Sequence, residues 1–227
     1  MSKTYSLRVL TASLVVPTAS LTIASSALAQ NVIVPDATLG AESSQVIPRD
    51  ATTDLIEGGA IRDANLFHSF QDFNVGEGLQ VYFNNPTGID NILSRVTGGN
   101  PSDIFGTLGV EGPANLFFLN PNGIMFGPEA SLDVEGSFLA TTAEGVRFSG
   151  GDIFSTNNAA STSVLSIGVP LGLQYGTNAT AATIENTAAL TSGQDLTLAA
   201  DNLDLQGTIQ AAENISLKAR DTLKIRD

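Results

Sequence analysis

Apolar and polar residues alternate over short stretches of the chain, with the two-residue period of a β-strand that has one buried face. The alternation is clear at residues 79–84 and recurs at 104–108 and 132–134. Two further segments, 116–119 and 124–126, are continuously apolar, which is typical of strands that are covered on both faces. The pattern therefore predicts many short strands.

Glycine and proline leave little room for α-helices. Between Pro35 and Gly207 one or the other recurs at short intervals, so a typical amphipathic helix would be interrupted. Beyond Gly207 the apolar residues keep to odd-numbered positions, which is again the period of a strand. They are Ile209, Ala211, Ile215, Leu217, Ala219, Leu223 and Ile225. We therefore predict an all-β chain.

The last third of the chain contains a repeat. Leu196-Thr-Leu198 recurs as Ile215-Ser-Leu217, and Leu203-Asp-Leu205 recurs as Leu223-Lys-Ile225, at two offsets that are almost equal. The period of about 20 residues is typical of one turn of a β-solenoid with small or polar corners. Sixteen asparagines suit such corners, or can stack in hydrogen-bonded ladders. The open end of the stack needs a cap, which we assign to residues 30–60, with the coil at 61–227.

Composition narrows the range of functions. Ten Lys and Arg against 23 Asp and Glu give a net charge of −13 at pH 7, which argues against a nucleic-acid partner because phosphate binding needs a dense basic surface. The chain has no cysteine and a single histidine, which leaves little material for a metal site or a catalytic triad. We therefore predict no catalytic residue, no cofactor and no metal, and expect a monomer.

The segment 1–29 has the features of a signal peptide. Lys3 and Arg8 form a basic start without acids, a moderately apolar stretch follows, and Ala27-Leu-Ala29 before Gln30 is a small-x-small cleavage site. Seven Ser and Thr residues within the apolar stretch make it a poor membrane-spanning helix. We expect cleavage after Ala29 and export of the mature chain.

The segment Asn120-Pro121-Asn122-Gly123-Ile124 joins the two continuously apolar runs. Proline presets the first position of a turn, the side chain of Asn120 can cap that turn, and glycine readily takes left-handed backbone angles. The pentapeptide predicts the tip of a β-hairpin, and taken alone it implies nothing more.

Three segments that follow the signal peptide in order carry a family resemblance: 65–70 (NLFHSF), 84–99 (NNPTGIDNILSRVTGG) and 115–124 (NLFFLNPNGI). With this context the chain closely resembles the secretion domain of the filamentous haemagglutinin family, over roughly residues 31–190. Proteins of that family are the large exoproteins of two-partner secretion.

The resemblance implies a right-handed parallel β-helix with an N-terminal cap and extra-helical β-hairpins. It also implies recognition by an outer-membrane β-barrel transporter with periplasmic recognition domains, which passes the largely unfolded chain through the outer membrane to the cell surface or the medium. A solenoid adds turns one at a time, so we expect stepwise folding outside the cell to pull the chain through. Binding of host or cell-surface ligands would then lie in regions beyond this chain.

The resemblance also implies a secretion motif. In the family an Asn-Pro-Asn-Gly-Ile motif is tied to secretion, and it maps onto Asn120, Pro121, Asn122, Gly123 and Ile124. The usual companion motif, Asn-Pro-Asn-Leu, has no match in this chain. A related segment is a candidate second motif: Asn85, Pro86, Thr87, Gly88 and Ile89. If the transporter recognises the first motif, we expect replacement of Asn120 by alanine to reduce surface delivery more than stability.

Other residues that could carry chemistry have simpler explanations. We expect His68, which lies among aromatics, to be a packed and hydrogen-bonded strand residue, and Arg95 to tie a corner or pair with Asp90 or Asp103. The carboxylates of Asp195, Asp201 and Asp204 could gather a divalent ion, but a solvated acidic surface is the simpler interpretation.

Two other classes of function stay open at this point. Parallel β-helices also host glycan-cleaving enzymes, so a hydrolase with a pair of carboxylates is one alternative. Few cations lie between residues 50 and 217, namely Arg62, Arg95 and Arg147, which argues against an acidic polysaccharide substrate. The other alternative is a stand-alone, truncated surface protein. The leading hypothesis is the secretion domain of a haemagglutinin-like adhesin that continues beyond residue 227.

Overall fold

The computed structural model describes residues 30–157, 170–176 and 181–226, and in that part of the chain the regular structure is β-strand apart from one 3-10 turn. None of the described helical structure is long and apolar enough to cross a membrane. The elements are β1 (Val32–Pro35), η1 (Gly40–Glu42), β2 (Ser44–Pro48), β3 (Thr53–Gly58), β4 (Ala60–Arg62), β5 (Asn65–Asn74), β6 (Gln80–Asn84), β7 (Asn91–Val96), β8 (Ser102–Ile104), β9 (Thr107–Glu111), β10 (Asn115–Leu119), β11 (Ile124–Phe126), β12 (Ser131–Asp133), β13 (Phe138–Thr141), β14 (Gly145–Phe148), β15 (Ile153–Ser155), β16 (Pro170–Gln174), β17 (Thr183–Asn186), β18 (Leu190–Ser192), β19 (Leu196–Leu205), β20 (Ile209–Ala211) and β21 (Ile215–Ile225).

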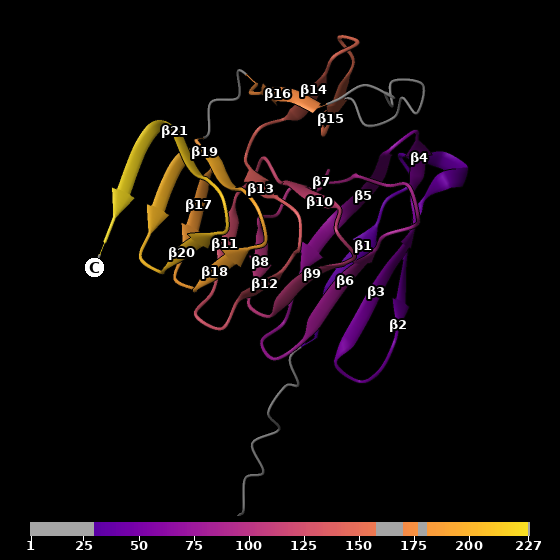
Figure 1. The fold of residues 1–227 in the computed structure, drawn as a ribbon, viewed down its shortest axis with the longest axis horizontal. Helices are drawn as coiled ribbons and strands as arrows, with labels where there is room; N and C mark the ends of the chain where they lie inside the picture. The colour runs from indigo at the N-terminus through magenta and orange to yellow at the C-terminus, as the bar shows by residue number, and fades with distance from the viewer. Residues whose placement is uncertain (1–29, 158–169, 177–180, 227) are drawn as a thin grey trace, which may run out of the picture.

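The strands stack in parallel into a coil with three faces (Figure 1). The first face joins β5, β7, β10, β13 and the N-terminal halves of β19 and β21. The second face joins β3, β6, β9 and β12, and next to β12 lies the pair formed by β18 and β20. The third face joins β8, β11, β17 and the C-terminal halves of β19 and β21. The predicted β-helix is thus confirmed.

The sequence repeat corresponds to the register in which the strands of the last two turns pair. Leu196 lies opposite Ile215 and Leu203 lies opposite Leu223, so the apolar triplets of β19 and β21 stack directly on one another. The register shifts just after Ala200, where both strands pass from the first face to the third. This shift explains why the two sequence offsets are not identical.

An asparagine ladder joins successive turns at the start of the first face. The side chain of Asn91 donates to Asn65 at 3.0 Å over a separation of 26 residues, and Asn115 donates to Asn91 at 3.0 Å over 24. The oxygen of Asn115 accepts from the backbone of Ser137, 22 residues further on. In the last described turn the corresponding hydrogen bond spans 19 residues. Apart from the turn that carries the extra-helical sheet, where the backbone of Asp195 donates to Ser137 across 58 residues, the turns therefore become shorter toward the C-terminus.

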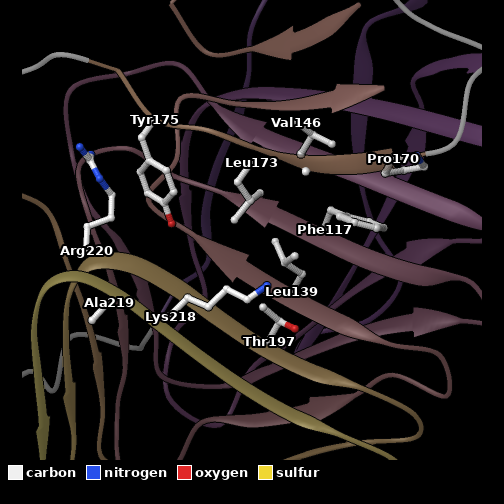
Figure 2. Close-up of a pocket in the computed structure, with 11 residues that line it drawn as sticks. Phe117, Leu139, Val146, Pro170, Leu173, Tyr175, Thr197, Lys218, Ala219 and Arg220 are labelled. Carbon is white, nitrogen blue, oxygen red and sulfur yellow. The ribbon is translucent and has the colours of Figure 1, made fainter. Parts of the chain in front are cut away.

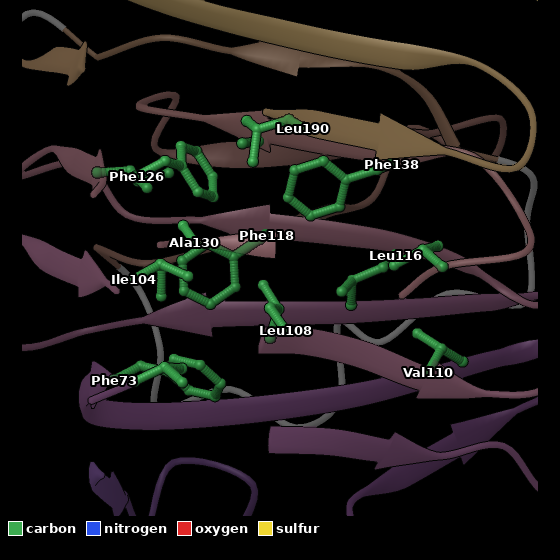
Figure 3. Close-up of a cluster of buried hydrophobic side chains, with 14 of the residues drawn as sticks. Phe73, Ile104, Leu108, Val110, Leu116, Phe118, Phe126, Ala130, Phe138 and Leu190 are labelled. Carbon is green, nitrogen blue, oxygen red and sulfur yellow. The ribbon is translucent and has the colours of Figure 1, made fainter. Parts of the chain in front are cut away.

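The interior of the coil changes along its axis in the same direction (Figure 3). Aromatic rings fill the first turns. The ring of Phe73 stacks on that of Phe83 with 5.9 Å between the ring centroids, and it meets the ring of Phe118 edge-on with 5.0 Å between the centroids. Smaller side chains fill the later turns. These are Leu190, Leu196, Leu198, Ala200, Leu203 and Leu205, all buried in the same core.

Antiparallel strands lie along the N-terminal edge of the coil. Strand β1 pairs with β5, β2 pairs with β3, and the short β4 folds back on the start of β5. Strand β3 pairs in parallel with β6 on its other side, so it is also the first strand of the second face. The antiparallel strands therefore cap the stack without continuing the coil.

A small antiparallel sheet of β14, β15 and β16 lies outside the coil between β13 and β17 (Figure 1). It packs against outward-facing residues of the first face, which explains why segment 116–119 is apolar on both sides, as predicted. The same prediction for 124–126 is wrong. Met125 is 36% exposed because it points outward from the third face, whereas the extra-helical sheet covers the first.

Candidate functional site

Residues 120–124 form a corner of the coil. Strand β10 pairs with β7 and β13, whereas β11 pairs with β8 and β17, so the strands on either side of this segment belong to different faces of one turn. The predicted hairpin tip is therefore wrong. In a β-helix, consecutive strands pair with the turns above and below instead of with each other, and a tight turn then redirects the chain between faces.

The side chain of Asn120 is completely buried and holds this corner together. Its Nδ2 donates to the carbonyl oxygen of Asn100 at 3.0 Å and to Oγ of Ser102 at 2.9 Å, both on the preceding turn. Its Oδ1 accepts from the backbone N–H of Asn122 at 2.9 Å. A buried amide that satisfies its hydrogen bonds in this way has a structural role.

Gly123 and Ile124 are also fixed by the fold. Gly123 has a φ of +123°, which favours glycine, and a Cβ at this position would lie 3.1 Å from the carbonyl oxygen of Thr183. The side chain of Ile124 points into the core and is 2% exposed. These two residues are therefore out of reach of a partner once the domain has folded.

Pro121 and Asn122 are the residues of the motif that face outward, Pro121 partly and Asn122 fully. The side chain of Asn122 lies over the corner of the preceding turn, where Nδ2 donates to the carbonyl oxygen of Gly98 at 2.8 Å. A partner that reads this motif on the folded surface would have to contact these two side chains.

The candidate second motif lies at a different corner, between β6 of the second face and β7 of the first. Ile89 is buried, and its N–H donates to the carbonyl oxygen of Pro86 at 3.2 Å. With its amide oxygen facing Ala114, Asn85 accepts from that residue's N–H and donates to the carbonyl of Ile89, both at 3.2 Å. Gly88 has a φ of +89° and lies in open space, and Thr87 is exposed. The two motifs are therefore not brought together in one site.

Arg95 is buried, and three parts of the molecule converge on it. Its guanidinium donates to Oγ of Ser69 on β5 at 2.9 Å, to Oγ1 of Thr38 in the N-terminal segment at 2.8 Å, and to the carbonyl oxygen of Ser155 in the extra-helical sheet at 2.7 Å. Burial lowers the pKa of Arg95 to about 10. The predicted structural role is confirmed by these contacts.

The acid that balances Arg95 is Asp36, and the predicted partners Asp90 and Asp103 are wrong. The carboxylate of Asp36 accepts from the hydroxyls of Thr38 (2.5 Å), Ser69 (2.8 Å) and Thr97 (2.6 Å). Burial disfavours its charged form, but these hydrogen bonds outweigh burial and lower the pKa of Asp36. Sequence reasoning missed this cluster because its members come from four segments that only the coil brings together.

His68 is a packed strand residue, as expected. It is completely buried between the rings of Phe70 and Phe83, and its Nδ1 lies 3.1 Å from Oγ of Ser44. Its Nε2 has no hydrogen-bond partner among the described residues, and neither has Oγ of Ser94, which lies directly across the strand pair. Burial lowers the pKa of His68 to about 3, so the imidazole is neutral in the folded domain.

The three C-terminal aspartates are engaged separately. Asp201 pairs with Arg220 at 2.9 Å, Asp204 pairs with Arg226, and Asp195 accepts from the side chain of Asn214. Among the residues that the structure describes, no three acidic or histidine side chains come together in a way that could hold a metal ion. The suggested divalent-ion site is therefore not assembled there.

The strand order and the buried corner define a β-helix domain, and comparison with known proteins shows its family. A family model described as the TPS secretion domain matches residues 31–226. The solved HMW1 secretion domain from Haemophilus influenzae aligns with a TM-score of 0.58 at 21% identity, over 84% of this chain and 44% of that one. The solved filamentous hemagglutinin secretion domain aligns at a TM-score of 0.41 and 16% identity, over 85% of this chain and 99% of that one.

The chain belongs to the family of TPS secretion domains. These are non-enzymatic targeting domains of two-partner secretion exoproteins, so the alternative of a glycan hydrolase is wrong. A curated relative, the heme/hemopexin-binding protein of Haemophilus influenzae (strain ATCC 51907 / DSM 11121 / KW20 / Rd), is 35% identical over 72 residues. That match covers 32% of this chain and 8% of the relative, so the chain corresponds to a small part of that protein's length.

Proposed function

We propose that this chain is the targeting domain of a haemagglutinin-like surface adhesin, and that an outer-membrane β-barrel transporter recognises it through periplasmic domains and the motif at 120–124. After removal of residues 1–29 the chain crosses the outer membrane largely unfolded, and it folds on the outside. The observation that supports this best is the match of residues 31–226 to a TPS secretion domain.

The transporter could recognise the motif in the unfolded chain or on the surface of the folded domain, and the burial of the motif distinguishes these two cases. Asn120, Gly123 and Ile124 are buried in the folded domain, so they can be contacted directly only while the chain is unfolded. Pro121 and Asn122 are accessible in both states. Because transport requires an unfolded chain, we propose that the whole pentapeptide is read before folding and becomes a structural corner afterwards.

The fold itself suits stepwise closure outside the cell. Each turn pairs with its neighbours alone, and the capped N-terminal end carries the large aromatic core. A stack of this kind can grow by adding one turn at a time to a formed end. We propose that the first turns form the folding nucleus and that later turns draw the rest of the chain outward.

The test compares export and stability in two variants. Asn122→Ala is expected to leave the free energy of unfolding within about 0.5 kcal/mol of the parent because its side chain is exposed, and to reduce surface delivery severalfold. Asn120→Ala is expected to lose about 2 kcal/mol, because the corner loses a buried amide with its hydrogen bonds. Comparing the losses of export and of stability in Asn120→Ala tests the expectation from sequence that this residue affects export more than stability.

Asn100→Ala is the matched control, because Asn100 is an exposed asparagine at the same corner one turn earlier. It should affect neither export nor stability. Normal delivery of Asn122→Ala, measured by surface proteolysis in cells that express the transporter, would refute recognition of the motif. Delivery that simply follows stability across all three variants would assign the motif a folding role alone.

A further inference from the structure

An apolar groove of about 400 Å³ lies beside the contact of the extra-helical sheet with the coil, between part of that sheet and the first face of the coil (Figure 2). Phe117 and Leu139 line it from β10 and β13, and Val146 and Leu173 line it from the extra-helical sheet. Its volume lies in the range of roughly 300–1,000 Å³ that is typical of ligand sites. None of these residues takes part in the motif at 120–124.

Two cationic residues of β21, Lys218 and Arg220, line the groove. They differ in whether another side chain already compensates the positive charge. Arg220 pairs with Asp201 at 2.9 Å and lies 4.8 Å above the ring of Tyr175, so its charge is already compensated. The side chain of Lys218 has no ion pair or hydrogen bond with any residue that the structure describes. Its amine points toward Leu139 inside the groove (Figure 2). In a chain of net charge −13, this is a localised site for an anion beside an apolar surface.

The groove also runs along a strand edge. Within the described residues β16 pairs with β14 alone, which makes it the edge strand of its sheet. Pro170, Gly172 and Leu173 of this strand line the groove. A side chain added at Gly172 would meet no atom within 4 Å, so the backbone is approachable at this point. An exposed edge of this kind can accept an additional extended strand.

We propose that this groove binds an extended peptide segment of a partner protein, with apolar side chains at alternate positions and a carboxylate that pairs with Lys218. Main-chain hydrogen bonds to the edge of β16 hold the segment, and alternate side chains enter the apolar space. The strand edge favours a peptide over a fatty acid, because an acyl chain offers nothing to backbone donors and acceptors.

The proposed binding is distinct from the targeting function. The groove is assembled from residues between Phe117 and Arg220 that lie on six strands or just beyond them, so it exists only after the domain has folded. The targeting function proposed above acts on the unfolded chain. The partner of the groove is therefore met after transport, and either proposal can fail without the other.

Two synthetic peptides test this proposal by fluorescence anisotropy against the purified protein. The first, acetyl-Leu-Thr-Val-Thr-Asp-Thr-amide with a fluorescent label, places Leu, Val and Asp on one side of a strand. The second has Asn in place of Asp. We expect the acidic peptide to bind at least tenfold more tightly, and the difference to shrink as salt is raised.

Lys218→Gln should abolish the preference for the acidic peptide. Lys224→Gln should keep it, because Lys224 lies in the part of the same strand that belongs to the third face, opposite Asp204 in the register. Both lysines are exposed, so both variants should fold like the parent. Equal affinity for the two peptides, the same loss in Lys224→Gln, or no binding of either peptide would overturn the proposal. Binding of decanoate at the groove without binding of the peptides would overturn it in favour of an acyl-chain site.

Discussion

The guanidinium of Arg95 lies over the ring of Phe154, 4.4 Å from its centroid, and links the coil to the sheet outside it. Arg95 belongs to β7 of the first face, and Phe154 belongs to β15 of the extra-helical sheet. The same guanidinium donates to the carbonyl of Ser155 and, through Thr38, reaches the N-terminal segment. A single side chain thus connects three structural units.

Replacing Arg95 should therefore destabilise the domain strongly. Arg95→Met leaves the half-buried carboxylate of Asp36 without its compensating charge and removes three hydrogen bonds, so we expect a loss of about 3 kcal/mol in the free energy of unfolding. Urea denaturation measures the loss. Arg147→Met, in the neighbouring sheet but exposed, should change stability by less than about 0.5 kcal/mol. Similar losses in the two variants would contradict the role assigned to Arg95.

Stability should also fall in mild acid because of His68. Its pKa is about 3 in the folded domain against 6.5 normally, so the unfolded chain takes up the proton first as the pH drops. The contribution of this residue is therefore complete above pH 6.5 and is lost progressively between 6.5 and about 3. At pH 5 the loss from this residue is about 2 kcal/mol.

The variant His68→Gln cannot titrate at this position and separates His68 from the acidic residues. We expect it to be less stable than the parent at pH 7 but to lose much less on going to pH 5. Asp36 does not interfere, since its pKa lies below 3.8 and its contribution is lost only at lower pH. A parent protein with equal urea midpoints at pH 7 and pH 5 would show that His68 is not held neutral.

Tyr82 and Gly109 form a contact that depends on the absence of a side chain. The ring of Tyr82 lies across Gly109, where an added Cβ would come within 2.4 Å of the ring, and the hydroxyl donates to Asp133 at 2.8 Å. Burial and this hydrogen bond raise the pKa of Tyr82 to about 12. Gly109→Ala should displace the ring and cost about 1–3 kcal/mol.

The displaced tyrosine should then titrate closer to pH 10, which ultraviolet absorbance of the tyrosinate would detect. Gly99→Ala serves as the control, since a Cβ there meets no atom within 4 Å. Should Gly109→Ala leave both the titration and the stability unchanged, the ring would have another resting place on the surface.

The asparagine ladder allows a test of how much the side-chain hydrogen bonds between successive turns stabilise the domain. Asn91 is its middle member, donating to Asn65 and accepting from Asn115. Asn91→Ala breaks both hydrogen bonds, and we expect a loss of about 2 kcal/mol. Asn214→Ala, which removes an exposed contact with Asp195, should lose less than half as much by urea denaturation. The reverse order would mean that exposed corners, not the ladder, hold the turns.

Sequence patterns predicted the strands and their stacking well, because both leave periodic signals. The two leucine-rich triplet pairs became the register of β19 and β21, and the run at 116–119 is apolar on both sides because the extra-helical sheet packs on Phe117 and Leu119. The prediction of a β-hairpin at 120–124 was wrong because a turn sequence specifies a change of direction and does not specify the strand with which the chain pairs next.

The contacts that hold the domain together were beyond sequence reasoning. Arg95 and Asp36 are far apart in the sequence, and in the folded domain the hydroxyl of Ser69 links the guanidinium to the carboxylate. No local sequence pattern marks such a pair. The groove at Lys218 likewise depends on how the extra-helical sheet lies against the coil, which follows from packing and leaves no periodic trace.

Outside the turn that carries the extra-helical sheet, the turns shorten from 26 to 19 residues, and this gives the coil a direction of growth. A late turn immobilises about seven fewer residues than the first, which spares roughly 10 kcal/mol of backbone entropy. Exchanging a few phenylalanines for leucine forfeits only a few kcal/mol in return. Among the turns that consist of the coil alone, the wide aromatic turns at the N-terminal end therefore cost the most backbone entropy to order, and the last turn costs the least.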